Sequence, residues 1–440
     1  MEKARILIMC YGTRGDVEPY VALALGLGAR GHEVTLATAR QFGDWVASFG
    51  VAFAPLTDDA IDLIHSSDGK ALVEGAGGLV RRVTAGGRVA RVARRAGEQL
   101  IRDALAVAET ADPDLIVYHP KVTAAPHIAE GTGRPAVMGL LQPIVLPTEA
   151  FPPTGLPPLS VPGYNRLAYR LVSASYAPFR KAVNRFRDEV YGLPPICSGH
   201  EVILPPGAGL IPILHAVSPA VIPRPPDWPA HACLTGYWQL PQDDRFEPPA
   251  ALSRFLSEGP APVYVGFGSM VSENPAKLRR TVTEALRLAG VRGVVASGWA
   301  GFEEGERDGM IVIPPVPHAW LFPRMAALVH HGGAGTSASG FAAGTPCVIC
   351  PFFGDQPGWA RRSVDLGVGA RPVPRKTLDP ESLAASIREA VTDPRLKANA
   401  RGLADRLARE DGVATAAELI EARLGGGHAP DTPIPDRPPA

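Results

Sequence analysis

Polar residues that could do chemistry stand directly after short apolar runs, where strands would end. Residues 11–19 (Tyr-Gly-Thr-Arg-Gly-Asp-Val-Glu-Pro) follow the apolar run 5–9 and place the carboxylate of Asp16 at a strand-to-helix turn. Open α/β folds bind ligands at the carboxyl edge of their strands. Asp16 is therefore either a general base for a bound substrate or the N-cap of a helix that begins near Pro19.

A second polar group follows the apolar run 327–330. His330 and His331 precede a glycine-rich turn, and Thr336 stands in the first turn of the helix that should follow. The free N–H groups and positive dipole of a helix start favour a bound diphosphate. His331 and Thr336 can each add a donor, so the pattern predicts phosphate binding, with a plain polar helix start as the alternative.

Two further strand ends carry polar side chains. Asp355 and Gln356 follow the run 347–350, and a carboxylate beside an amide suits the vicinal hydroxyls of a sugar. Ser269 supplies a hydroxyl in the glycine-containing turn after the run 263–267. The alternative for Asp355 and Gln356 is a solvated turn.

The elements that must position these groups alternate between apolar runs and helical repeats. This alternation predicts two doubly wound α/β domains with parallel sheets, which suits a chain of 440 residues. We expect an N-terminal domain over residues 1–221, a proline-rich linker over 222–262, a C-terminal domain over 263–424 and a flexible tail over 425–440. The stretch from 164 to about 190 is expected to be helical.

Composition narrows the classes of function. Lys plus Arg and Asp plus Glu both number 44, so no overall field draws the chain to nucleic acid. No run reaches the ~18 apolar residues of a membrane helix, and five scattered cysteines suit a reducing cytoplasm. Asp112 and Asp114 read as a turn and Cys347 and Cys350 as core, so no metal site is predicted.

A basic stripe runs from Arg81 to Arg95 at near-helical spacing. The default interpretation is a solvated helix face. The alternative is peripheral contact with anionic lipid at the inner face of a membrane.

Several blocks together resemble the sterol glucosyltransferases and the related glycopeptide-antibiotic glycosyltransferases of glycosyltransferase family 1. The resemblance implies the GT-B fold, in which two Rossmann-like domains face each other across a cleft. In that fold the acceptor binds to the N-terminal domain and the donor to the C-terminal one. The blocks are residues 10–19, 316–324, 330–336 and 351–356, with 118–121 and 126–130 similar to the sterol branch in particular.

The resemblance also implies residue roles. It makes Asp16 the general base of the reaction and places Val316 and His318 against the base of the nucleotide. Where plant relatives have a tryptophan at this place, the present sequence has Pro315 and Val316. The nucleotide of the donor can therefore be a uridine or a thymidine diphosphate. The implied donor-binding residues are Thr13, Ser269, Val316, His318, His331, Gly333, Gly335, Thr336, Asp355 and Gln356.

The implied reaction is inverting transfer of a hexose, glucose in the first instance, from UDP-glucose to a hydroxyl of a hydrophobic acceptor such as a sterol or triterpenoid. The product would be a β-glycoside, with no metal or cofactor beyond the nucleotide sugar. Acceptor contacts are expected in loops near Leu63, Leu141, Phe151 and Tyr164, which could equally be loop core.

Alternatives remain at this stage. One is a tailoring transferase for a polyketide, macrolide or glycopeptide that uses a dTDP- or UDP-sugar. Another is a non-catalytic, transferase-like helper protein, which would be expected to lack the base or the phosphate-binding residues.

Overall fold

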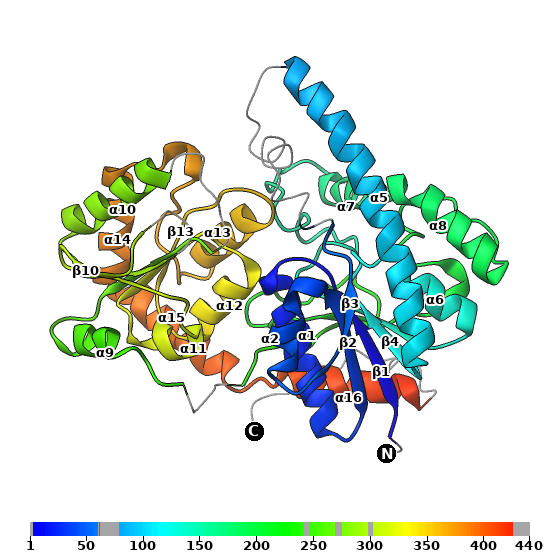
Figure 1. The fold of residues 1–440 in the computed structure, drawn as a ribbon. Coiled ribbons are helices and arrows are strands. Elements are labelled where there is room, and N and C mark those ends of the chain that lie inside the picture. Colours follow the sequence, from blue (N-terminus) through cyan, green and yellow to red (C-terminus); the bar gives the residue numbers. More distant parts are fainter. Residues whose placement is uncertain are drawn as a thin grey trace. The chain divides into compact units, whose positions relative to one another are not determined.

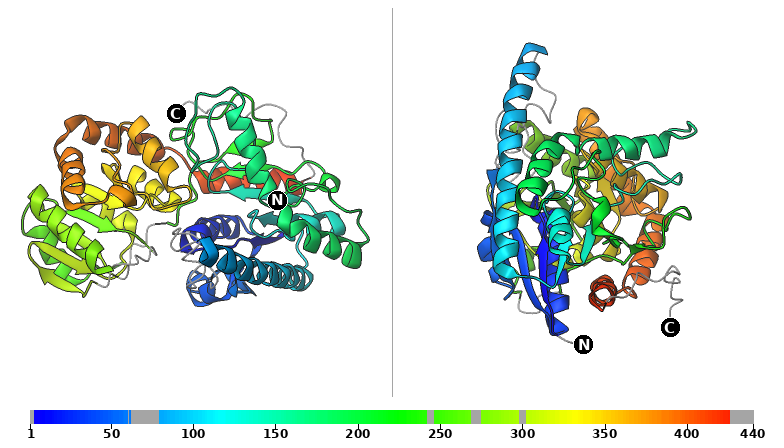
Figure 2. Two further views of the ribbon diagram at one scale, coloured as in Figure 1. Left: turned by 90° about the horizontal axis from the view of Figure 1, so that it is seen from above. Right: turned by 90° about the vertical axis from the view of Figure 1, so that its right-hand side faces the viewer.

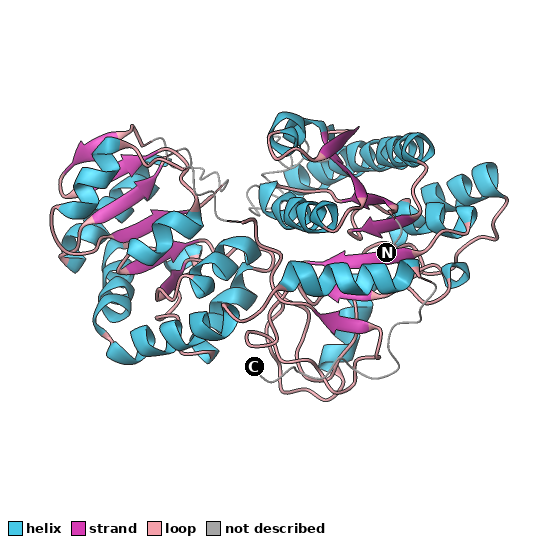
Figure 3. Ribbon diagram, turned by 90° about the horizontal axis from the view of Figure 1, so that it is seen from below, coloured by secondary structure: helices cyan, strands magenta, loops and turns pink. Residues whose placement is uncertain are grey.

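The computed structural model describes residues 3–59, 61, 79–241, 246–268, 275–297 and 302–425, with side chains of the long helix α5 from residue 92 onward. The chain divides into two compact units (Figure 1). Unit 1 comprises residues 1–153, 158–240 and 411–440, and unit 2 comprises 154–157 and 241–410. In Figure 3 the strands of each unit form one layer with helices on either side.

Unit 1 is built on a parallel sheet of seven strands in the order β3-β2-β1-β4-β5-β6-β7. Ile8 of β1 pairs with Leu36 of β2 on one side and with Val117 of β4 on the other. The strands are β1 (Arg5–Met9), β2 (Glu33–Ala39), β3 (Ala52–Leu56), β4 (Leu115–Tyr118), β5 (Ala136–Leu140), β6 (Ile213–His215) and β7 (Ala232–Leu234).

Helices cover both faces of this sheet, so its strands are apolar almost throughout. Leu7 and Met9 of β1 enter one core, whereas Ile6 and Ile8 enter the core on the opposite face. The helical segments are α1 (Arg14–Ala29), η1 (Arg40–Phe42), α2 (Gly43–Ala47), α5 (Leu79–Ala111), α6 (Ala125–Thr132), α7 (Tyr164–Ala174), η2 (Ala177–Phe179), α8 (Arg180–Phe186), η3 (Arg187–Tyr191), η4 (Pro206–Ala208) and α16 (Gly412–Leu424).

Helix α1 starts earlier than the sequence predicted. Thr13 is its N-cap, Asp16 lies in its first turn, and Pro19 lies inside the helix. The missing N–H of Pro19 leaves the carbonyl of Gly15 without its helical donor, which the second turn tolerates. The expectation of a helix that begins near Pro19 was therefore wrong.

The division between the units also differs from the expected linker over 222–262. Strand β7 pairs with β6, so the chain up to Leu240 belongs to unit 1. The last helix, α16, returns to unit 1 beside α1 (red in Figure 2), where Ile420 is buried and Glu421 pairs with Arg30 at 2.5 Å. Apolar burial and this ion pair explain why 411–424 leaves the C-terminal unit.

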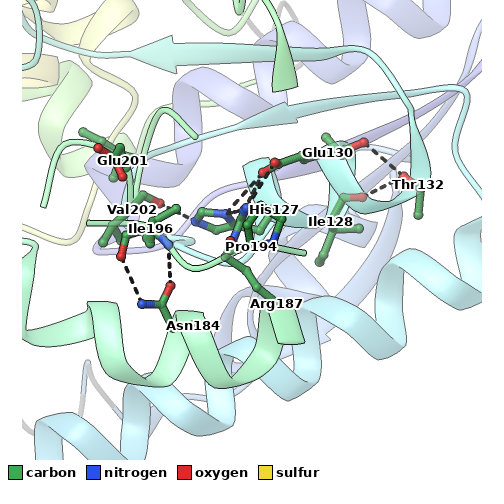
Figure 4. A network of polar contacts seen from close by, with 12 residues as sticks. His127, Ile128, Glu130, Thr132, Asn184, Arg187, Pro194, Ile196, Glu201 and Val202 are labelled. Atoms are coloured by element: carbon green, nitrogen blue, oxygen red, sulfur yellow. Dashed lines mark hydrogen bonds and ion pairs between the residues drawn. The ribbon is translucent and has the colours of Figure 1, made fainter. Parts of the chain in front are cut away.

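The expected helix from 164 to 190 is broken into α7, α8 and the π-helical turn η3. A buried ionic network ties η3 to α6 (Figure 4). Both terminal nitrogens of Arg187 donate to the carboxylate of Glu130. Arg187 Nη1 also donates to His127 Nδ1 at 2.8 Å, and its Nε donates to the carbonyl of Pro194 at 2.9 Å.

His127 serves this network as a neutral ring. Burial lowers its pKa to about 3, and the charge of Arg187 acts in the same direction. Its Nε2 therefore donates to the carbonyl of Val202 at 3.0 Å, while its Nδ1 accepts from Arg187. His127 and Glu130, which lie in the 126–130 block of the sequence, hold η3 at the end of α8.

Unit 2 contains a six-stranded sheet in the order β10-β11-β9-β8-β12-β13, parallel except for the edge strand β10. The strands are β8 (Val263–Gly266), β9 (Gly293–Ala296), β10 (Gly305–Arg307), β11 (Met310–Ile313), β12 (Ala327–His330) and β13 (Cys347–Ile349). The helical segments are α9 (Ala250–Ser257), α10 (Pro275–Ala289), α11 (His318–Leu321), η5 (Phe322–Arg324), α12 (Ala334–Ala342), α13 (Gln356–Asp365), η6 (Arg375–Thr377), α14 (Pro380–Thr392) and α15 (Pro394–Leu407).

Across the portion of the chain that the structure describes, no helix combines the length and apolar character needed to cross a bilayer.

Candidate active site

The carboxyl edge of the first sheet brings Asp16 and Lys121 together, because β1 and β4 are neighbours. Lys121 Nζ donates to Asp16 Oδ1 at 2.8 Å. The amide and hydroxyl of Thr13 donate to Asp16 Oδ2 at 2.8 and 3.1 Å. These three bonds leave one acceptor position on Oδ1 for a further donor. The Asp16 side chain stays 24 % exposed, so solvent or a substrate can reach it.

Gly12 makes this position of the carboxylate possible. Its φ is +147°, and a Cβ at this residue would lie 2.2 Å from Asp16 Oδ2. A side chain here would strain the backbone and push the carboxylate away. Glycine at position 12 is thus required by the geometry of Asp16.

Opposing influences set the charge of Asp16. Burial, the largest single influence, raises its pKa, but the Lys121 ammonium and the hydrogen bond from the Thr13 amide contribute to a net lowering. The neighbouring His119 is buried, and desolvation lowers its pKa to about 3. Near neutral pH this edge therefore holds a carboxylate, an ammonium and an uncharged imidazole.

The sequence did not reveal the partner of Asp16. Thr13, which is predicted to bind the donor, donates its hydroxyl to Asp16 in this structure. Lys121 belongs to the block 118–121 that resembles the sterol branch, but the resemblance gave it no role. The sequence nevertheless contained a signal for Lys121. His119 and Lys121 come just after the apolar run that forms β4, as Asp16 comes after the run that forms β1.

The glycine-rich turn of unit 2 leads from β12 into α12 as predicted. Gly333 is the N-cap, and no side chain caps the helix. The first N–H groups of a helix have no partner within the helix, so those of residues 334–336 are open to a ligand. His330 is buried, and its Nδ1 accepts from the amide of Gly332 at 3.1 Å, so it holds the turn.

His331 lies among glycines from two different turns. A Cβ at Gly268 would lie 3.0 Å from its Cε1, and a Cβ at Gly333 would lie 2.6 Å from its Nε2. Burial lowers the pKa of His331 to about 4, so the ring is neutral at physiological pH. Its Nδ1 is buried and has no hydrogen-bond partner among the described residues. Such an orphaned nitrogen calls for a ligand or a water molecule.

The predicted pair Asp355 and Gln356 lies next to this turn. A Cβ at Gly332 would come within 3.2 Å of the Gln356 carbonyl oxygen. Gln356 Oε1 accepts from the amides of Phe352 and Phe353 at 2.7 and 3.2 Å. Its amide carbonyl therefore stabilises the turn, a use that the sequence did not suggest.

Asp355 is half-buried, and the buried indole of Trp359 orients its carboxylate. Trp359 Nε1 donates to Asp355 Oδ2 at 2.9 Å. Because the Trp359 side chain is only 1 % exposed, its packing restricts where the indole N–H can point and so restricts the orientation of the Asp355 carboxylate.

The remaining donor candidates lie at the same edge of the second sheet. His318 stacks on Phe322 with ring centroids 4.1 Å apart, and Val316 is half-buried beside it in the loop that follows β11. Thr336 is partly exposed in the first turn of α12, next to exposed Gly335. Ser269 lies outside the described residues.

The acceptor candidates are mostly half-buried loop residues. Leu141 and Phe151 each pack against a core of unit 1, and Tyr164 begins α7, whereas Leu63 lies outside the described residues. Near Phe151, buried polar atoms lack partners in the described part of unit 1. These atoms are Tyr169 Oη, His215 Nε2 and Trp228 Nε1, with the rings of His215 and Trp228 stacked at 4.4 Å.

Within the described ranges, no group of three or more His, Cys, Asp or Glu side chains is placed to hold a metal ion.

Comparison with known proteins identifies the architecture first. The crystal structure of the glycotransferase of kitacinnamycin matches with a TM-score of 0.71 at 22 % identity, covering 96 % of this chain and 100 % of the other. Two α/β units with parallel sheets, a held carboxylate at one sheet edge and an amide-rich turn at the other, define a GT-B protein.

The sequence comparisons then give the family. Residues 6–139 match the glycosyltransferase family 28 N-terminal domain, and residues 307–421 match the C-terminal domain of erythromycin biosynthesis protein CIII-like proteins. Sterol 3-beta-glucosyltransferase UGT80A2 of Arabidopsis thaliana is 34 % identical over 94 % of this chain. UGT80B1 of the same plant is 32 % identical over 99 % of this chain.

The chain spans 65 % of the length of UGT80A2 and 70 % of that of UGT80B1. It belongs to the glycosyltransferase family that includes these sterol 3-beta-glucosyltransferases.

Proposed function

We propose that this protein is an inverting glycosyltransferase that moves glucose from UDP-glucose to the hydroxyl of a hydrophobic alcohol, a sterol or a similar lipid. The observation that carries the proposal is the carboxylate of Asp16. It is held by Thr13 and Lys121, is ionised, and keeps one acceptor position open.

The chemical step is a single displacement. The acceptor oxygen attacks C1 of the sugar while its proton passes to Asp16 Oδ1. The bond from C1 to the diphosphate oxygen breaks, and its electron pair leaves with the diphosphate. Attack from the opposite face converts an α-linked donor into a β-glycoside. A placed general base contributes about 10²–10⁴-fold to such a step.

Lys121 has a supporting part in this mechanism. Its ammonium helps to keep Asp16 ionised and ready to accept a proton. An acceptor hydroxyl that donates to Asp16 Oδ1 would also lie in the field of this ammonium, which would stabilise negative charge on the attacking oxygen. The cost is a less basic carboxylate, because the same charge lowers the pKa of Asp16.

The leaving diphosphate is assigned to the start of α12. The amides of residues 334–336 and the neutral ring of His331 would donate to it, as would the hydroxyl of Thr336 in the first turn of α12. The family resemblance adds the hydroxyl of Ser269. We expect this set to act without a metal ion, so activity should persist in EDTA after exhaustive dialysis. Loss of activity restored by Mg²⁺ would contradict that part of the proposal.

Sugar and base recognition follow from the neighbouring turns. Asp355, fixed by Trp359, is expected to accept hydrogen bonds from sugar hydroxyls, with the Gln356 amide beside it. The half-buried Val316 and His318 would contact the nucleotide base. A hydroxyl-binding carboxylate favours glucose over a deoxysugar, and hence UDP-glucose over a dTDP-deoxysugar.

The acceptor class is proposed from the relatives, whose printed names specify sterol glucosylation. A hydrophobic alcohol also fits the apolar loops around Leu141, Phe151 and Tyr164 in unit 1. We place the enzyme in the cytoplasm, in peripheral contact with the inner face of the membrane. Of the Arg81–Arg95 stripe, the structure describes the side chains of Arg94 and Arg95, and both are exposed.

A donor screen followed by a turnover assay tests the proposal. A ligand that binds only the folded state raises the melting temperature by mass action. UDP-glucose should give the largest shift among UDP-sugars and dTDP-sugars, and purified protein should glucosylate a sterol to a β-glucoside, read by NMR of the product. A preference for dTDP-sugars would favour the antibiotic-tailoring alternative, and donor binding without turnover on any acceptor would favour a non-catalytic helper.

A further inference from the structure

Unit 1 carries an exposed apolar face on α7 and the loop before it. Leu167 and Leu171 are 54 % and 63 % exposed and, four residues apart, lie on one side of the helix. Leu159 and Val161 in the preceding loop are 50 % and 60 % exposed. We call these four residues the α7 face. Isolated exposed leucines are ordinary, but several large side chains at this exposure in one short segment indicate an interaction surface.

The chain segment that carries the α7 face has charges of one sign only. Between Glu149 and Asp188 the chain contains no acidic residue. Basic residues in this stretch are Arg166, Arg170, Arg180, Lys181, Arg185 and Arg187.

Some of these basic residues are neutralised and others are not. Arg166 pairs with Glu149 at 3.2 Å and faces Asp227 at 3.8 Å, and Arg187 is buried against Glu130. Arg170, on the same exposed side of α7 as Leu167, has no acidic partner among the described residues.

The α7 face lies at the end of unit 1 that carries Asp16. In Figure 1 α7 lies beyond the carboxyl ends of the strands, whereas the N-terminus lies at the opposite end. The opposite side of α7 is fixed to the unit, since Tyr169 is fully buried and Asn165 Nδ2 donates to the carbonyl of Glu149 at 2.7 Å. The segment is thus a supported platform beside the loops that follow β5.

We propose that the α7 face docks on the surface of an anionic phospholipid bilayer. Leucine and valine side chains would enter the boundary between headgroups and acyl chains, while Arg170 would pair with a lipid phosphate. This inference rests on the proposed function, because a lipid alcohol acceptor would then be drawn from the bilayer that the face contacts. It concerns a segment other than the Arg81–Arg95 stripe.

Vesicle flotation tests the docking without requiring turnover. The protein should float with vesicles of phosphatidylcholine and phosphatidylglycerol and much less with phosphatidylcholine alone. Leu167→Ser combined with Leu171→Ser should lower the partition coefficient by about 10- to 100-fold, since two leucines lose their contact with acyl chains. Arg170→Glu should weaken binding and reduce its dependence on salt.

Matched controls separate this surface from general effects. Leu210→Ser removes an exposed leucine elsewhere in unit 1, and Arg401→Glu reverses an exposed charge in unit 2. Both should float like the parent protein. The thermal shift caused by UDP-glucose should be unchanged in the leucine double variant, and flotation of the parent protein does not require turnover, so failure of docking and failure of the proposed reaction give different results.

Several results would overturn the proposal. One is flotation of the double variant equal to that of the parent protein, and another is a parent protein that ignores anionic vesicles. A third is a change from dimer to monomer in sedimentation when the leucines are replaced, with no effect on flotation, which would assign the α7 face to a second copy of the chain.

Discussion

The two candidate sites solve opposite electrostatic problems. At the edge of the first sheet Asp16 is a formal charge already paired with Lys121 and bonded by Thr13. At the edge of the second sheet the turn before α12 contains no formal charge, and His331 Nδ1 has no partner in the described structure. The first site is nearly complete without a ligand, whereas the second leaves its donors open.

This difference fits the two tasks of a group transfer, which are to accept the proton of the attacking hydroxyl and to bind the anionic leaving group. A proton acceptor must stay ionised and correctly oriented, which Gly12, Thr13 and Lys121 ensure. A site for an anionic leaving group must instead present donors that no internal acceptor has satisfied. Single substitutions can therefore disable either site separately.

Asp16→Asn removes the proposed base while keeping the size of the side chain. We expect kcat to fall by about 10²–10⁴-fold, because an amide accepts no proton from the attacking hydroxyl. Initial rates with saturating donor and acceptor measure the effect. A variant with the parent turnover number would rule out the assignment of Asp16.

His331→Ala tests the proposed site for the leaving diphosphate. Loss of one preorganised donor to a developing anion costs about 10²–10³-fold in kcat. His331→Gln, which keeps an N–H donor, should recover part of this loss. Equal rates for the alanine and glutamine variants at the parent level would show that the ring does not touch the leaving group.

Gly12→Ala tests how strictly the carboxylate is held. An added Cβ would lie 2.2 Å from Asp16 Oδ2, so the carboxylate must move and activity should drop by about tenfold or more. Gly28→Ala, near the end of the helix α1 that carries Asp16, is the control, because a Cβ there meets nothing within 4 Å. The control should keep full activity and gain about 0.5–1 kcal/mol of stability. Parent-like activity in Gly12→Ala would mean that the observed position of Asp16 is not needed.

Lys121→Met should change the pH profile more than the maximal rate. A general base works as the carboxylate, so kcat/KM falls as pH drops through the pKa of Asp16. Lys121 contributes to lowering that pKa, so its removal should move the acid limb to higher pH. Lys397→Met in unit 2 is the control and should leave the limb in place. If the acid limb of the kcat/KM profile lies at the same pH in Lys121→Met as in the parent protein, the observed ion pair does not set the ionisation of Asp16.

Much of this arrangement was accessible from the sequence. The two-domain α/β class is confirmed, as are the strands that end before residues 10, 331 and 351. These predictions rest on local signals, namely apolar runs followed by glycine-rich turns. Such signals survive folding because they depend on neighbouring residues.

What the sequence missed depends on contacts between distant residues. The pair of Asp16 and Lys121 requires β4 to lie beside β1, and strand order has no local signature. Gln356 could not be assigned to its own turn, because its amide oxygen reaches backbone groups only in the folded loop. The return of α16 to unit 1 likewise depends on Glu421 meeting Arg30, far earlier in the chain.

The division of labour between the two sites is tested most directly by calorimetric titration of UDP-glucose into Asp16→Asn and His331→Ala in parallel. We expect the parent Kd for Asp16→Asn and a Kd weakened by about tenfold or more for His331→Ala, which loses a hydrogen bond to a charged group. Weakened binding in Asp16→Asn together with unchanged binding in His331→Ala would refute these two assignments.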